Sequence, residues 1–410
     1  NKGYVTYELV EQLRSSFTGP IFIDTKKKDL RKIPNCYIKI NQSEYEQLQT
    51  YPLKSLLIVT MGKEGAQYDG EHYAAPKVEV VDVEANPKAL HNTPRKKSER
   101  DMMQRGERPR GCEYCWKIED IGRDNISDRV YKTVIYEDKD LDEAYNTPWE
   151  NDVNLKTLEI AFDRTCQFAC SYCNPAFSST WVRDIRRNGP YTQLVSDGRN
   201  HFTHTHDAAQ LYDYGQDNPY IDAFFKWWES DLHHTLQELR ITGGEPLMSG
   251  HTWRLIDWFK ENRGKSQTKL AINSNLGMDS NKLKEFIEAI RDVQDVELYT
   301  SCESLNEQAE YIRDGLDYKQ WFSNLVELYK SGAVKQLHVM STINGLCLLS
   351  LPQFLEHLMD FKMGWGRESL SFTLNILRFP SFQSPTVMPY GIREECAINL
   401  EKFLFRFENS

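Results

Sequence analysis

Strand-like and helix-like segments alternate through the second half of the chain, and this alternation restricts the possible folds more than any other feature. Strands that alternate with helices of about ten to fifteen residues predict right-handed βαβ units and a parallel sheet. Six units over about 225 residues favour an open, partial (β/α)6 TIM barrel over a closed barrel of eight strands. The expected strands of this α/β fold are Leu155–Phe162, Leu236–Thr242, Lys269–Ser274, Val296–Ser301, Gln336–Thr342 and Ser369–Leu377.

The remainder of the chain lacks this alternation. With 410 residues, the protein should contain two or three domains at roughly 100–200 residues each. We expect an N-terminal auxiliary region over 1–150, the barrel over 151–380 and a C-terminal helical extension over 381–410. Within the first region, Ser55–Met61 and Lys77–Val83 are the plausible strands.

Composition and charge exclude several classes of protein. The net charge of −10 disfavours nucleic acid as a partner of the whole molecule. Apolar runs are too short to span a bilayer, and the polar start resembles no export signal, so we expect a cytoplasmic protein without a membrane partner. The stretch from Arg95 to Arg110 holds seven basic and three acidic residues. We expect a solvated surface there, with contact to an acidic substrate or peptide as the alternative.

Nine cysteines, five of them in two tight groups, indicate metal binding rather than disulfides. Cys166, Cys170 and Cys173 follow the first expected strand directly. Three thiolates at spacings of four and three can bind three irons of a [4Fe–4S] cluster and leave the fourth iron open. A zinc site would need a fourth Cys or His close by, and none follows Cys173 within twenty residues.

This motif, Cys166-x-x-x-Cys170-x-Tyr172-Cys173, resembles the CxxxCxΦC signature of the radical S-adenosylmethionine (SAM) superfamily, in which Φ is aromatic. A second motif typical of that superfamily, GGEP, ends the second expected strand. The resemblance implies a [4Fe–4S] cluster and SAM as cofactors, with the GGEP carboxylate near the SAM amino group. The motif residues beyond the cysteines and Tyr172 are Gly243, Gly244, Glu245 and Pro246.

Polar residues at the ends of later strands extend the resemblance. The carboxyl ends of barrel strands form the catalytic face in such folds. In the superfamily, residues there contact the SAM carboxylate, ribose and adenine, although strand-end capping would explain each polar residue equally well. The residues expected to bind the cofactor are Asn273, Ser274, Asn275, Ser301, Arg313, Ser341 and Asn344.

The second cysteine group, Cys112 and Cys115, lies in the segment RGCEYCWKIEDIGRDNISDR. This segment resembles the auxiliary-cluster region of radical SAM proteins of the twitch or SPASM type. The resemblance implies an auxiliary iron–sulfur cluster at Cys112 and Cys115, with Cys36 as a further ligand. Zinc or a vestigial site is the alternative.

Together these resemblances predict an oxidoreductase-like or peptide-modifying radical SAM enzyme. Such an enzyme cleaves SAM reductively to a 5′-deoxyadenosyl radical, which abstracts hydrogen from a peptide or small-molecule substrate. Oxidation, crosslinking and epimerisation are the possible outcomes, and flavodoxin or ferredoxin is the expected electron donor. A radical SAM enzyme that modifies nucleic acid, or a non-catalytic iron–sulfur binding protein, is the alternative.

Overall fold

The computed structural model describes residues 6–33, 35–51, 56–61, 66–68, 71–73, 87–122, 127–191 and 218–407. The chain divides into two compact units, Asn1–Val83 and Glu84–Ser410. The division thus falls at residue 83, not near residue 150 as the sequence suggested. The reason is that helices before residue 150 contact the remainder of the second unit. For example, Lys156 Nζ lies 2.7 Å from a carboxylate oxygen of Glu143. The expected strand Lys77–Val83 lies outside the described residues.

The first unit contains a five-stranded sheet in the order β1-β2-β3-β4-β5. The first three strands are parallel, and β4 and β5 are antiparallel to their neighbours. Its apolar core includes Val10, Ile38 and Ile40. The elements are α1 (Tyr7–Ser16), β1 (Phe22–Asp24), β2 (Tyr37–Asn41), α2 (Gln42–Glu46), β3 (Leu56–Thr60), β4 (Ala66–Tyr68) and β5 (Glu71–Tyr73).

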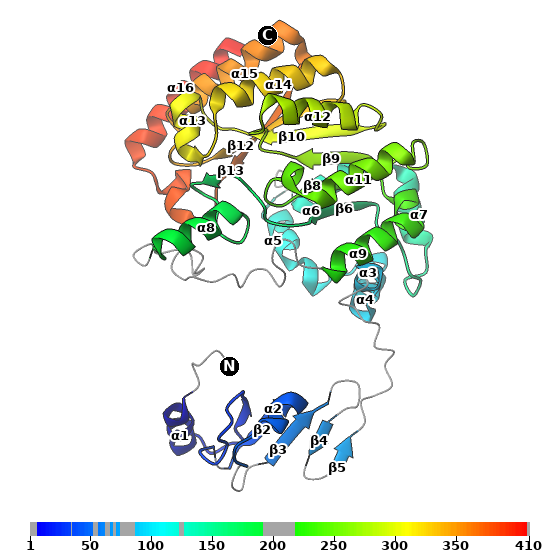
Figure 1. The fold of residues 1–410 in the computed structure, drawn as a ribbon, viewed down its shortest axis with the longest axis vertical. Coiled ribbons are helices and arrows are strands. Elements are labelled where there is room, and N and C mark those ends of the chain that lie inside the picture. Colours follow the sequence, from blue (N-terminus) through cyan, green and yellow to red (C-terminus); the bar gives the residue numbers. More distant parts are fainter. Residues whose placement is uncertain are drawn as a thin grey trace. The chain divides into compact units, whose positions relative to one another are not determined.

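Six parallel strands form the main sheet of the second unit (Figure 1). They follow chain order across the sheet, β6-β8-β9-β10-β12-β13, and all neighbouring pairs are parallel, as predicted. Among the described residues the edge strands β6 and β13 do not pair with each other, so this sheet is open. The strands are β6 (Thr157–Ala161), β8 (Glu238–Thr242), β9 (Lys269–Asn273), β10 (Val296–Ser301), β12 (Gln336–Ile343) and β13 (Ser371–Ile376).

One face of this sheet packs against helices. Alternate strand residues such as Leu239, Ile241 and Leu298 are fully buried in the largest apolar core, because successive side chains point to opposite faces. The same core takes in the apolar stripes of the crossover helices. These helices are α9 (Pro219–Trp227), α11 (Gly250–Glu261), α12 (Ser280–Ile290), α13 (Asn306–Ile312), α14 (Tyr318–Ser331) and α15 (Leu351–Trp365).

The opposite face of the sheet is polar. Arg240 Nη2 lies 2.9 Å from Glu238, and its guanidinium stacks 4.1 Å from the centroid of the Tyr299 ring. Lys269 bridges Glu238 and Glu297 at 2.8 and 3.4 Å. These charges neutralise one another, as partly buried charges must. Any molecule bound against this face would meet hydrogen-bonding groups rather than an apolar wall.

A helical region precedes the sheet: α3 (Pro87–His91), α4 (Pro94–Gln104), α5 (Glu113–Ile121), α6 (Asp128–Lys132) and α7 (Asp138–Asn146). Within the described parts of 87–150, no large apolar side chain is fully buried. Contacts with both edge strands position the region instead. The Tyr136 hydroxyl lies 3.3 Å from Thr157 in β6, and Arg378, just beyond β13, donates to the Tyr114 hydroxyl at 2.6 Å. The region therefore reaches both edges of the open sheet.

The last helix, α16 (Tyr390–Phe407), packs on α15 (Figure 1). Cys396 and Phe403 of α16 share a small core with Leu351 and Leu355. Among the described residues, no helix combines the length and the apolar character needed to cross a membrane.

Candidate functional site

The loop that carries Cys166, Cys170 and Cys173 begins two residues beyond the end of β6 and ends where α8 (Ser179–Asn188) begins. The start of α8 holds this cysteine loop, residues 163–178, in place through side-chain hydrogen bonds. Thr180 Oγ1 donates to the Cys166 carbonyl at 2.7 Å, and Trp181 Nε1 donates to the Cys170 carbonyl at 3.0 Å. The loop backbone is therefore fixed at both of these cysteines.

A two-residue antiparallel ladder joins the cysteine loop to a distant segment. β7 (Ala169–Cys170) pairs with β11 (Arg313–Asp314), and Cys170 stands opposite Arg313. The Ser171 amide extends the ladder by donating to the Ile312 carbonyl at 2.7 Å. Arg313 therefore lies beside Cys170 because the two backbones are hydrogen bonded, whatever its side chain does.

Burial dominates the chemistry of the three thiols. It raises the pKa of Cys170 to about 12 and that of Cys173 to about 11, and it also raises the pKa of Cys166. The thiols are near enough for each of Cys166 and Cys173 to raise the pKa of Cys170 further. Within the described ranges, no three His, Cys, Asp or Glu side chains are grouped closely enough to hold a single metal ion.

The donors around the thiols suit soft-metal ligation. The Phe168 amide points at Cys166 Sγ at 3.4 Å, and Arg313 Nη1 lies 3.9 Å from Cys170 Sγ. N–H donors and a cation favour the thiolate form that iron requires. Three half-buried, mutually interacting thiols with such donors therefore fit an iron–sulfur cluster.

Arg313 belongs to a buried ion pair. Its Nη2 and Nε lie 2.7 and 3.1 Å from one oxygen of Glu303, which is fully buried. The Tyr172 hydroxyl lies 3.4 Å from the other oxygen of Glu303. Although burial lowers the pKa of Arg313, Glu303 raises it well above its usual value, so the guanidinium is charged. The aromatic residue of the cysteine motif and the basic residue noted in the sequence thus meet at one carboxylate.

Protein backbone explains the two glycines of the GGEP motif. A Cβ on Gly243, whose φ is +114°, would lie 2.6 Å from the Asp163 carbonyl oxygen. A Cβ on Gly244 would lie 2.3 Å from the Thr165 carbonyl oxygen. The close neighbour of both glycines is the backbone of the cysteine loop. The glycines allow the two loops to pack, and the Glu245 amide donates to Thr165 at 2.6 Å.

Glu245 is a buried carboxylate whose three hydrogen-bond donors are all neutral. It accepts from the Ser274 hydroxyl at 2.8 Å, from the Asn275 amide at 2.6 Å and from the Leu247 amide at 3.1 Å. Burial raises its pKa to about 7. An ammonium group beside it would supply the positive charge that these donors lack. Three of the residues singled out in the sequence are thus brought together here.

Other predicted cofactor residues have structural contacts. Ser341 donates to the Cys302 carbonyl at 2.7 Å, and Asn344 caps its own turn through Thr342 and Leu346; both are fully buried. Asn273 accepts from Arg240 at 3.1 Å on the polar face of the sheet. Asn344 therefore makes a capping contact, whereas Ser341 lies within β12 and contacts the residue that follows β10.

Ser301 and Pro246 are the remaining two predicted positions. Ser301, the last residue of β10, is half-buried, and Pro246 begins a 3₁₀ turn (Pro246–Met248).

Cys112 and Cys115 lie at the start of a helix. A 3₁₀ turn (Arg110–Cys112) runs directly into α5, which places the two thiols three residues apart on one helical face. Tyr114, between them, accepts the hydrogen bond from Arg378 that links α5 to the carboxyl end of β13. Cys36 belongs to the first unit, where it is buried in the apolar core.

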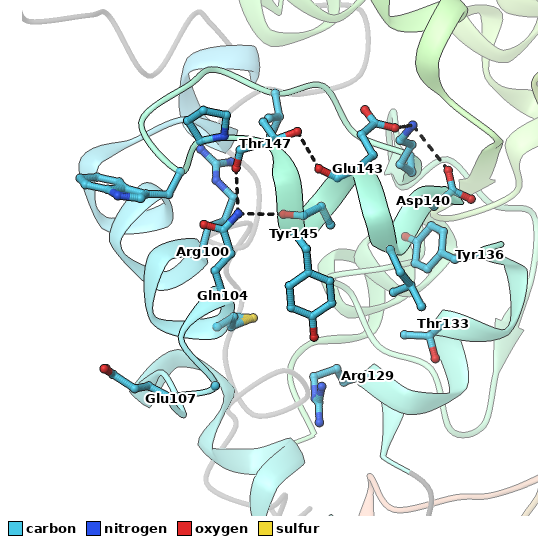
Figure 2. Close-up of a pocket in the computed structure, with 18 of the residues that line it drawn as sticks. Arg100, Gln104, Glu107, Arg129, Thr133, Tyr136, Asp140, Glu143, Tyr145 and Thr147 are labelled. Carbon is cyan, nitrogen blue, oxygen red and sulfur yellow. Dashed lines mark hydrogen bonds and ion pairs between the residues drawn. The ribbon is translucent and has the colours of Figure 1, made fainter. Parts of the chain in front are cut away.

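A separate cavity of about 560 Å³ lies between α4, α5, α6, α7 and the segment that leads into β6 (Figure 2). Gln104 spans it, donating to the carbonyls of Ala144 and Thr147 at 2.8 Å each. Tyr145 projects between Gln104 and Arg129 in this view. The cysteine-loop residues are not among those that line the cavity. No sequence pattern predicts this cavity, because its walls come from short helices with mixed apolar and charged residues.

Several residues that hold the site together were missed in the sequence. Asp163 accepts from Ser249 at 2.6 Å and thereby joins the cysteine loop to the GGEP loop. Gln383 donates to the Ser171 carbonyl at 2.9 Å from the far end of the chain. Neither residue lies in a recognisable motif, so pattern alone could not have identified them.

The sequence matches no protein-family model, and no curated protein matches it either. Solved structures do match. SuiB of Streptococcus suis, bound to S-adenosylmethionine, is 12% identical over 72% of this chain and 60% of that chain, with a TM-score of 0.36. The protein anSMEcpe with bound AdoMet is 15% identical over 61% of this chain and 60% of that chain, with a TM-score of 0.38.

A third match, TYW1 with a lysine-pyruvate adduct bound, is 12% identical over 62% of this chain and 74% of that chain, with a TM-score of 0.30. The chain spans about 60% of the length of the SuiB and anSMEcpe chains.

Proposed function

We propose that this chain is a radical SAM enzyme with a partial (β/α)6 barrel. The observation that carries the proposal is the packing of two motifs on each other. The cysteine loop and Gly243–Pro246 follow neighbouring parallel strands, and their backbones are joined by hydrogen bonds at Asp163 and Thr165. A zinc site at the three cysteines would not account for this contact with the GGEP motif.

The chain's own residues would hold two cofactors. Cys166, Cys170 and Cys173 would ligate three irons of a [4Fe–4S] cluster, and Glu245 would accept from the amino group of SAM. With both groups bound, the site would supply one-electron reductive cleavage of SAM. The protein's tasks are to fix the cysteine loop through α8 and β11 and to exclude water from the thiols.

A peptide is the substrate class that we favour. The polar face of the sheet offers hydrogen-bonding groups suited to a peptide backbone, including Arg240 and Tyr299. Among the matching structures, SuiB is described bound to the precursor peptide SuiA. Hydrogen abstraction from a peptide or a small molecule would lead to oxidation, crosslinking or epimerisation.

Nucleic acid is disfavoured by the ion pairs of the basic stretch. Arg95 and Lys96 both pair with Glu99, and Arg108 pairs with Asp120 at 2.8 Å. Lys97 pairs with Asp152 at 2.7 Å. Because these four cations share three carboxylates, only one net positive charge among them is left for a phosphate backbone.

An auxiliary iron–sulfur cluster at Cys112 and Cys115 is part of the proposal. Support comes from the helical region itself, since its described residues bury no large apolar side chain. A metal centre would offset the ordering entropy of such a region. The hydrogen bond between Tyr114 and Arg378 also places α5 at the carboxyl end of β13, the side that would face the substrate.

The test is anaerobic reconstitution of the full chain, followed by iron counting and assay of 5′-deoxyadenosine from SAM. Replacing Cys166, Cys170 and Cys173 together by alanine should abolish 5′-deoxyadenosine formation, because no ligands would remain for the cluster. Replacing the buried Cys347 by alanine is the control, because Cys347 lies in a different apolar cluster. This variant should still form 5′-deoxyadenosine. Product from the triple variant would refute the proposed function.

A further inference from the structure

The buried ion pair of Glu303 and Arg313 calls for an explanation other than stability. Burying two opposite charges usually costs about as much as their attraction returns, and apolar replacements are often neutral or stabilising. Glu303 is fully buried and Arg313 is 5% exposed, yet both bonds between them end on a single carboxylate oxygen. The pair thus orients the guanidinium in one direction.

That direction is toward the cysteine loop. With Nε and Nη2 bound to Glu303, the remaining nitrogen, Nη1, lies 3.9 Å from Cys170 Sγ. The backbone ladder between β7 and β11 fixes the same two residues a second time. Tyr172, in the same motif, has its hydroxyl 3.4 Å from Glu303 and its ring 5.4 Å from the guanidinium.

We propose that Glu303 is a positioning residue that holds the Arg313 guanidinium against Cys170 and so sets the charge at the iron–sulfur cluster. This inference rests on the proposed function. It also differs from the role expected for Arg313 in the sequence, which was contact with the SAM carboxylate. In a buried site, unit charges a few ångströms away act strongly because little water screens them.

The direction of the effect follows from the two charges. Neutralising Glu303 leaves the guanidinium uncompensated and favours the more negative, reduced cluster, so the midpoint potential should rise. Neutralising Arg313 removes the cation in contact with Cys170, so the potential should fall. Charge placement therefore predicts opposite shifts for the two variants, whereas loosening of the loop would move both in the same direction.

The experiment is a redox titration of the reconstituted full chain without SAM, followed by electron paramagnetic resonance. Glu303→Gln should raise and Arg313→Gln should lower the midpoint potential. Each shift should change the ratio of oxidised to reduced cluster at least tenfold at fixed potential, or about 59 mV for a one-electron couple. Glu307→Gln, an exposed carboxylate on α13, is the control and should match the wild type. Arg313→Lys keeps the charge and should stay close to the wild type.

Each other outcome is decisive. Shifts of the same sign, or potentials equal to the control, overturn the proposal. If Arg313→Gln weakens SAM binding and leaves the potential unchanged, Arg313 serves the SAM carboxylate and the proposal fails. If Glu303→Gln does not retain a cluster, the fall expected for Arg313→Gln decides alone. If the wild-type chain assembles no four-iron cluster, the proposed function fails rather than this inference.

Discussion

Replacing Gly244 by alanine places one methyl group where the backbone of the cysteine loop already lies. The new Cβ would stand 2.3 Å from the Thr165 carbonyl oxygen and 2.6 Å from the Arg164 carbonyl carbon. Both are backbone atoms, so no side chain can rotate out of the way. The loop must therefore move away from the GGEP turn.

The cost can be worked out from the contacts. Forcing one methyl group into a packed region costs about 1–3 kcal/mol. The displacement also strains two loop-to-loop hydrogen bonds, from the Gly244 amide to Asp163 at 3.2 Å and from the Glu245 amide to Thr165 at 2.6 Å. With each bond contributing about 1 kcal/mol, we expect Gly244→Ala to lower the free energy of unfolding by about 3–5 kcal/mol.

Urea unfolding of the apoprotein, followed by tryptophan fluorescence, measures this loss. All nine tryptophans lie in the second unit, so the signal reports on that unit alone. Gly250→Ala is the matched control, because a Cβ there meets nothing within 4 Å and alanine suits a helix better than glycine. After reconstitution, Gly244→Ala should also bind less iron. Equal unfolding midpoints and equal iron for the two variants would refute the packing argument.

Two further predictions concern other parts of the second unit. The double variant Cys112→Ala/Cys115→Ala should lose about two to four irons per chain yet still cleave SAM, and unchanged iron would rule out the auxiliary cluster. Burial and nearby Arg240 lower the pKa of His338 to about 4 from 6.5. Between pH 6.5 and 4, His338 is protonated in the unfolded chain but neutral in the folded chain. The free energy of unfolding therefore falls as the pH drops through this range. His338→Gln should remove up to about 3 kcal/mol of this pH dependence in urea titrations; parallel curves for the two proteins would contradict it.

The strand order and the cysteine motif were predictable for a physical reason. A strand that is buried on one face shows apolar residues at alternate positions, as in Glu238–Thr242, and short-range spacing carries the cysteine motif. The GGEP motif was also found, but the reason for its glycines was not. Packing of one backbone on another leaves no periodic trace in the sequence.

The contacts that organise the site could not be predicted in the same way. Cys170 and Arg313 are 143 residues apart and meet through strands of two residues each, too short to show any alternation. The boundary near residue 83 was missed because the helical region before β6 has a mixed composition and no apolar core of its own. Its attachment depends on single contacts such as that between Tyr136 and Thr157.

The ladder between β7 and β11 has a consequence for the order of events during synthesis. The ribosome makes Cys170 before Arg313, which lies 143 residues further along the chain. At about 5–20 residues per second, this interval lasts roughly 7–30 s. For most of that time the nascent chain carries all three thiols but lacks the strand and the guanidinium that later lie beside Cys170. Under the proposed function, insertion of a cluster into a finished site must therefore wait until translation has passed β11.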